Sequence, residues 1–171
     1  MINFSSVLQG GDRRSIGRAD AVVRALIRDP SRFDELWDCL ASGDSVVRMR
    51  AADALEKFSR EDAARFAKHK RELLAQVPDD GTPEVRWHLI AITSRLALNA
   101  REAKEFCVQL REIVANDPSR IVKVMALQAA SEIRSRHPEL AAEFQQMLEF
   151  AHSSPWPSLK ARAVKLGAAK K

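Results

Sequence analysis

The hydrophobic residues between positions 45 and 58 repeat with the period of an α-helix. In the stretch SVVRMRAADALEKF, apolar side chains fall at Val47, Ala51, Ala54, Leu55 and Phe58. These positions share one face of a helix and leave most of the charged residues on the other faces. The pattern predicts an amphipathic helix with one buried face.

Three segments further along the chain repeat this pattern: TPEVRWHLIAITSRL, SRIVKVMALQAASEI and PSLKARAVKLGAA. Their alignment places one apolar column at spacings of 38, 37 and 37 residues: Val47, Val85, Val122 and Leu159. The next column consists of cations: Arg48, Arg86, Lys123 and Lys160. A weaker copy begins at Gly11. Self-similarity with such a period predicts stacked supersecondary units.

Other helical patterns separate these copies, over residues 31–42, 60–77, 101–116 and 138–153. Because the chain has no Tyr and almost no alternating β-branched runs, strands are not expected. We therefore predict an all-α fold of about four and a half helical hairpins, each an A-helix followed by a repeated B-helix. The hairpins form a single domain over 1–171. Residues 1–10 either complete a first hairpin or are flexible, and a basic helix over 158–171 caps the C-terminal end.

The repeated residues resemble the HEAT-repeat family of α-solenoids. The resemblance rests on a turn Asp, then Val-Arg, then small residues and Leu: Asp44, Val47-Arg48, Ala51-Ala52 and Leu55, with partial copies at Asp80/Val85-Arg86 and Asp117/Val122-Lys123. It covers residues 11–171, and the chain is also similar to a group of short bacterial HEAT-repeat proteins with the phrases VRMRAADALEK and EVRWH. The resemblance implies a right-handed α-α superhelix whose B-helices line a concave surface.

The cation column has two possible roles. In HEAT-type stacks an Arg at this position commonly reaches the turn acids of its own or the neighbouring repeat. The resemblance therefore implies a ladder of charge-assisted bonds for Arg48, Arg86 and Lys123, with Lys160 in the copy that lacks a turn Asp. The alternative is that these rim cations face a ligand.

A second set of B-helix positions points away from the buried seam on a helical wheel. Met49, Trp87 and Val124 share one position, and Met125 lies beside them. Arg50, His88 and Arg162 occupy the same wheel position as Met125. If B-helices line the concave surface, these residues form an apolar ridge with flanking cations, which is typical of a contact with a partner protein or peptide segment. The alternative is that Trp87 packs between adjacent B-helices as part of the core.

Composition and motifs argue against an enzyme. The two cysteines, Cys39 and Cys107, lie in apolar helical contexts, which indicates reduced core thiols and a cytoplasmic protein. The four His residues are scattered, and no metal-ligand spacing, Gly-rich phosphate loop or nucleophile elbow occurs. No window is apolar enough to span a membrane. We therefore expect no catalytic residues, no cofactor, no metal and no membrane contact.

Nucleic-acid binding is the alternative function, because the net charge is +5 and the N-terminal region is rich in arginine. The arginines are Arg13, Arg14, Arg18, Arg24, Arg28 and Arg32. Acids interrupt this cluster, however, and the excess charge comes from five cations after Glu149. A DNA-glycosylase-like activity using Asp53, Arg50, Trp87 and Arg86 is a weaker possibility. We predict a non-catalytic protein-binding scaffold.

Overall fold

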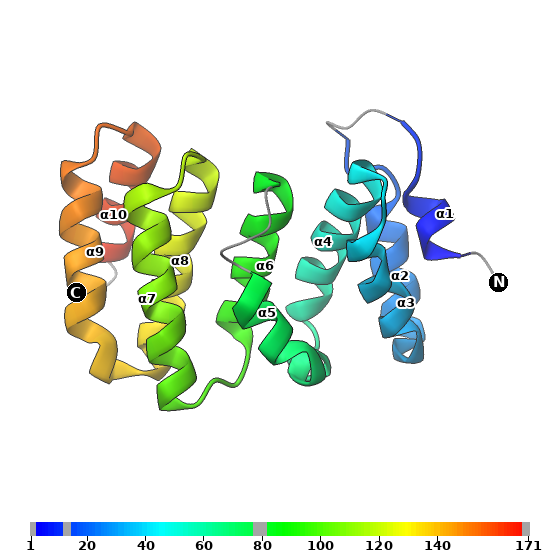
Figure 1. The fold of residues 1–171 in the computed structure, drawn as a ribbon, viewed down its shortest axis with the longest axis horizontal. Coiled ribbons are helices and arrows are strands. Elements are labelled where there is room, and N and C mark those ends of the chain that lie inside the picture. Colours follow the sequence, from blue (N-terminus) through cyan, green and yellow to red (C-terminus); the bar gives the residue numbers. More distant parts are fainter. Residues whose placement is uncertain (1–2, 12–14, 77–81, 169–171) are drawn as a thin grey trace. The chain divides into compact units, whose positions relative to one another are not determined.

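A computed structural model describes residues 3–11, 15–76 and 82–168. The described residues contain helices and no strand, which confirms the predicted all-α, HEAT-like solenoid fold. The handedness of the superhelix stays a prediction. The chain divides into two compact units, residues 1–69 and 70–171, and each is described by itself (Figure 1).

The first unit surrounds helix α4. Its helices are α1 (Phe4–Leu8), α2 (Ala19–Arg28), α3 (Phe33–Asp38) and α4 (Ser45–Ser59), with 3-10 turns at Pro30–Arg32, Cys39–Ala41 and Ala63–His69. Helix α4 contacts α1, α2 and α3. Its apolar positions are buried as the helical period predicted: Val47, Ala51, Ala54, Leu55 and Phe58.

The second unit surrounds helix α8. Its helices are α5 (Lys70–Gln76), α6 (Pro83–Arg95), α7 (Ala100–Asn116), α8 (Arg120–Arg136), α9 (Ala141–Ser153) and α10 (Pro157–Ala168), with a 3-10 turn at Pro138–Leu140. Helix α8 contacts the B-helices α6 and α10 and the A-helices α7 and α9. A-helices and B-helices thus form two rows, with α7 beside α9 (Figure 1).

Local capping residues set several helix ends. Asp44 caps α4, because its Oδ1 accepts a hydrogen bond from the Val46 backbone N–H at 2.8 Å. A capping box of Asn99 and Glu102 begins α7, and Pro83 occupies the first turn of α6, where a missing N–H has no cost. The predicted helix over 60–77 is divided into the 3-10 turn and α5.

The N-terminal segment is bound to α4 through Arg50. Residues 4–8 form α1, and Phe4 and Leu8 are buried, which favours a completed first hairpin over a flexible segment. The Arg50 guanidinium is 2% exposed and donates to the carbonyl oxygens of Leu8 (2.7 Å), Gly10 (2.6 Å) and Ser15 (3.1 Å). The chain passes so close to Arg50 at Gly17 that a Cβ there would lie 2.7 Å from Arg50 Cζ.

We expect Gly17→Ala to destabilise the first unit. Gly17 has a φ of +54°, which a residue with a side chain adopts only with strain, and the added methyl would displace a buried guanidinium. The free energy of unfolding should fall by about 1–3 kcal/mol in urea titrations. Gly43→Ala is the matched control, because no atom lies within 4 Å of its Cβ position and its φ is not positive. Equal stability of the two variants would contradict this account.

Candidate functional site

Three residues of the cation column, Arg48, Arg86 and Lys123, bind polar groups of the inter-helix turns, but Arg48 and Lys123 bind backbone carbonyls where the resemblance implied turn acids. Arg48 Nη1 donates to the Ser42 carbonyl at 2.6 Å, in the turn before its own helix. Lys123 Nζ donates to the carbonyls of Val114 (2.9 Å) and Ala115 (2.7 Å), at the C-terminal end of α7. Carbonyls at a helix end have no partner within the helix, so these cations satisfy them.

Arg86 contacts the turn of the next hairpin. Its guanidinium forms an ion pair with Asp117, whose side chain is only 3% exposed. Asp117 Oδ1 also accepts a hydrogen bond from the Ser119 N–H at 2.8 Å, so one carboxylate holds both the turn and the neighbouring B-helix. This arrangement corresponds to the ladder interpretation of Arg86. Lys160, by contrast, is exposed.

Burial changes the chemistry of Lys123. Loss of hydration lowers the pKa of its ammonium group, and the nearby Asp117 carboxylate opposes that shift. The side chain is 7% exposed, so its two carbonyl acceptors replace water. Lys123 therefore has a structural position and is not presented to a ligand.

The structure corrects part of the predicted concave ridge. Arg50, His88 and Val124 are buried, so these three side chains are not available to a partner. Arg50 is used by the N-terminal segment, and the His88 ring lies against the Trp87 ring with centroids 3.4 Å apart. Helical period gives the angle of each residue around its helix, but the packing of neighbouring elements decides which angles are exposed.

The other ridge residues are partly exposed. Met49 lies on α4 in the first unit, while Trp87, Met125 and Arg162 lie on three B-helices of the second unit. Arg162 Nη1 donates to Gln128 Oε1 at 2.9 Å, which joins α10 to α8. Arg162 therefore makes a hydrogen bond within the second unit.

A polar ladder continues along the B-helices of the second unit and was missed from the sequence. Gln128 Nε2 donates to Glu132 Oε1 at 3.1 Å, and Glu132 Oε2 accepts from Ser94 Oγ at 2.6 Å. Together with Arg162, these groups connect α10, α8 and α6. Arg136 of α8 adds a hydrogen bond of 2.8 Å to the Leu96 carbonyl after α6. The polar side chains on this face of the B-helices therefore connect neighbouring repeats.

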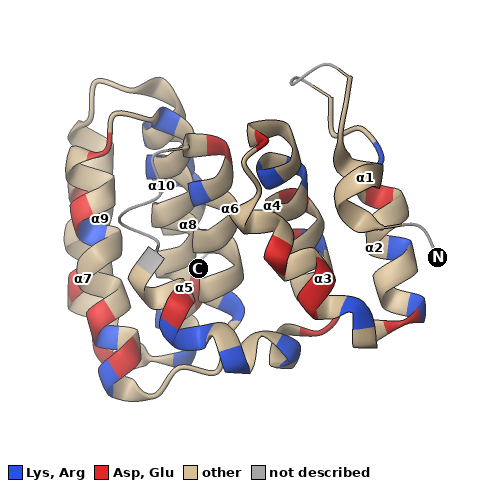
Figure 2. Ribbon diagram, turned by 45° about the vertical axis from the view of Figure 1, so that its right-hand side comes forward, with Lys and Arg blue, Asp and Glu red and all other residues tan. Residues whose placement is uncertain are grey.

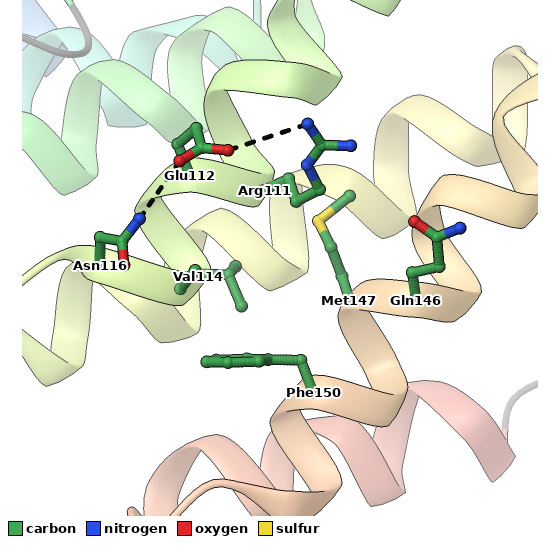
Figure 3. A pocket seen from close by; sticks show the side chains of 8 residues that line it. Arg111, Glu112, Val114, Asn116, Gln146, Met147 and Phe150 are labelled. Atoms are coloured by element: carbon green, nitrogen blue, oxygen red, sulfur yellow. Dashed lines mark hydrogen bonds and ion pairs between the residues drawn. The ribbon is translucent and has the colours of Figure 1, made fainter.

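An open groove of about 340 Å³ lies between the A-helices α7 and α9. Its floor is apolar: Val114 and Met147 are buried, and the Phe150 side chain is 45% exposed. Figure 3 shows these three side chains around one opening, with Gln146 and Arg111 on one side and Asn116 on the other. The sequence placed Phe150 in an A-helix but gave no sign that it would face solvent, because the groove joins two segments about 35 residues apart.

Polar residues line the rim of this α7–α9 groove. Arg111 Nη2 lies 3.8 Å from Glu112 Oε1, and Asn116 Nδ2 donates to Glu112 Oε2 at 3.2 Å. Both charged side chains are largely exposed, so their mutual attraction is weak and either can turn to another partner. An apolar floor with a polar rim is the usual anatomy of a protein-binding surface.

The arginines considered for nucleic-acid binding differ in exposure and in partners. Arg18, Arg24 and Arg28 are exposed, whereas Arg32 pairs with Glu35 at 2.7 Å and stacks on Phe4. Arg13 and Arg14 lie outside the described residues. Figure 2 shows cations and acids interspersed along α4 and along α7. Along α4 and α7, such mixing does not build the continuous positive surface that phosphate binding uses.

The two cysteine thiols are buried. Burial raises the pKa of the Cys39 thiol to about 11, and it does the same for Cys107. A thiol with so high a pKa stays protonated at neutral pH and is a poor nucleophile. Among the residues that the structure describes, no cluster of three or more His, Cys, Asp or Glu side chains is placed to hold a metal ion.

Stacked helical hairpins with a ladder of turn contacts define an α-solenoid. A family model of the HEAT repeat domain matches residues 10–166, and the chain belongs to the HEAT-repeat family. HEAT repeats generally mediate protein–protein interactions, and the family is typically non-catalytic. Comparisons with curated proteins and with solved structures gave no match. No helix in the described ranges is long and apolar enough to cross a membrane.

We expect Asp117→Ala to destabilise the second unit more than Asp44→Ala destabilises the first. Both substitutions remove a carboxylate that accepts a turn N–H, but Asp117 also neutralises the mostly buried Arg86. Loss of a cap costs about 1 kcal/mol, whereas breaking a buried ion pair costs about 3–5 kcal/mol. Urea titrations of both variants measure the difference. A loss for Asp117→Ala no larger than that for Asp44→Ala would exclude a stabilising ladder.

Proposed function

We propose that this protein is a non-catalytic binding module that holds a segment of a partner protein in the α7–α9 groove. The observation that carries the proposal is the apolar floor of an open groove, with Phe150 exposed to solvent and Val114 and Met147 beneath it. An exposed aromatic ring beside a cavity offers a partner side chain a site where both surfaces lose water. Family membership supports this class of function, because HEAT repeats generally mediate protein–protein interactions.

The rigidity of the surrounding helices supports the same use. The two groove helices contact each other, and both contact α8. Lys123 fixes the last turn of α7 through the Val114 and Ala115 carbonyls, directly beside the groove. A surface that is already ordered loses little conformational entropy when a partner binds.

The B-helix surface is the second candidate for the same function. Trp87 and Met125 are partly exposed on neighbouring B-helices of the second unit, and Trp is frequent among residues that dominate binding energy. We propose Trp87 as an additional contact rather than the main anchor, because the residues around it take part in the polar ladder. Substitution of Trp87 distinguishes the two surfaces.

Two proposals concern the whole chain. The first is that both units act together as one scaffold, which is the single domain over residues 1–171 that the sequence predicts. The two buried, reduced thiols fit a reducing compartment and support a cytoplasmic location.

We expect a photo-crosslinking amino acid at Gln146, on the groove rim, to capture a partner protein in lysate of the native cell. Phe150→Glu in the same chain should reduce this capture at least tenfold, because it places a charge on the apolar floor. Val164→Glu is the matched control, because Val164 is also strongly exposed but lies on α10 and does not line the groove. Capture is quantified by mass spectrometry.

Three outcomes decide between the surfaces. Capture that survives Val164→Glu and is lost with Phe150→Glu supports the α7–α9 groove. Capture that is insensitive to Phe150→Glu but lost with Trp87→Glu transfers the function to the B-helix surface. Capture that disappears after nuclease treatment favours nucleic-acid binding by the exposed arginines.

A further inference from the structure

We infer that the segment bound in the α7–α9 groove carries a basic residue next to its apolar anchor. This inference rests on the proposed function and adds the chemistry of the partner. The groove itself selects for an apolar side chain through Val114, Met147 and Phe150. The charges around it decide which residues can stand beside that side chain.

The groove lining has one acid and one cation, Glu112 and Arg111, and the charged residues of α9 are all acids. Glu112 lies on the rim with its side chain 61% exposed. Glu143 lies on α9 one turn before the groove, and its charge helps to raise the pKa of the Cys107 thiol on α7. Glu149 is exposed beside Phe150 in sequence but accepts a hydrogen bond from Gln145 Nε2 at 3.0 Å and does not line the groove. Helix α9 has neither Lys nor Arg along its length. A partner cation therefore finds Glu112 on the rim and Glu143 one turn before the groove on α9.

Arg111 is the cation of the groove rim, and it already has acidic neighbours. Its guanidinium lies 3.8 Å from the Glu112 carboxylate, and it also acts on the Cys107 thiol in the direction opposite to Glu143. Arg120, near the following turn, is stacked on the Trp156 ring at 4.1 Å. A partner carboxylate would therefore have Arg111 alone to meet on the rim, with Glu112 beside it.

The helix ends act in the same direction. The α7 part of the groove reaches the C-terminal end of that helix at Asn116, and on α9 Phe150 lies in the last turn before Ser153. The C-terminal end of a helix carries a partial negative charge and favours a nearby cation. Lys123 already uses this preference at the buried side of α7, where it binds the last carbonyls. A basic residue of the partner would be attracted by the same partial negative charge on the solvent side of α7.

The test uses three synthetic amphipathic peptides that share one stripe of leucines and differ only in having lysine, glutamine or glutamate beside it. Binding to the full chain is measured by fluorescence anisotropy at low and at physiological salt. The lysine peptide should bind about fivefold more tightly than the glutamate peptide at low salt, and the ratio should shrink as salt rises. Phe150→Glu should abolish binding of the glutamine peptide.

Substitutions of the acids locate the preference. Glu112→Gln combined with Glu143→Gln should bring the lysine and glutamate peptides to within twofold of each other. Glu105→Gln is the control, because Glu105 is an exposed α7 carboxylate that pairs with Arg101 and does not line the groove. It should leave the ratio unchanged.

Each remaining outcome overturns a separate statement. Equal binding of all three peptides, or preference for the glutamate peptide, with Phe150 still required, overturns the inferred basic neighbour and leaves the groove as a binding site. Absence of binding by every peptide also overturns the inference, while the crosslinking at Gln146 still decides the proposed function. A lysine preference that persists after both acids are neutralised assigns the selectivity to another surface.

Discussion

The stack depends on satisfying the backbone carbonyls where an A-helix turns into a B-helix. These groups lie between packed helices, and a buried carbonyl without a donor costs about as much as several apolar contacts contribute. Lys123 supplies the donor for α7, and Arg48 supplies it for the turn before α4. In both cases the cation follows directly after a buried valine. The valine packs in the apolar core, and the cation next to it binds the carbonyls of the turn. This coupling explains why the two columns recur together.

The helices and their order could be predicted because their causes are local. Apolar period, turn acids and prolines identify each B-helix and nearly every A-helix from fewer than 20 neighbouring residues. The 3-10 turn over residues 63–69 was missed, because the apolar period continues through it. In the turn before α10 a serine takes the role that Asp has in other repeats. Ser154 Oγ accepts a hydrogen bond from the Trp156 N–H at 3.2 Å.

The proposed binding surface could not be predicted in the same way, since its causes are long-range. Arg50 was placed correctly on its helix, yet its acceptors are carbonyls 35 to 42 residues earlier in the chain. The groove at Phe150 exists because α7 and α9 leave space between residues 111–116 and 146–150, and no pattern within either helix indicates that separation. A helical wheel gives the direction of a side chain around its own helix, whereas the packing of neighbouring elements determines whether that side chain is exposed.

In the second unit, holding repeats together and binding a partner make opposite demands on a side chain. The ladder from Ser94 through Glu132 to Arg162 uses its polar groups to join three B-helices, and groups satisfied in this way have little left to offer a ligand. Between α7 and α9 the helices contact each other but leave the ring of Phe150 uncovered. The α7–α9 groove therefore combines the exposed ring of Phe150 with support from helices that are held together by other contacts.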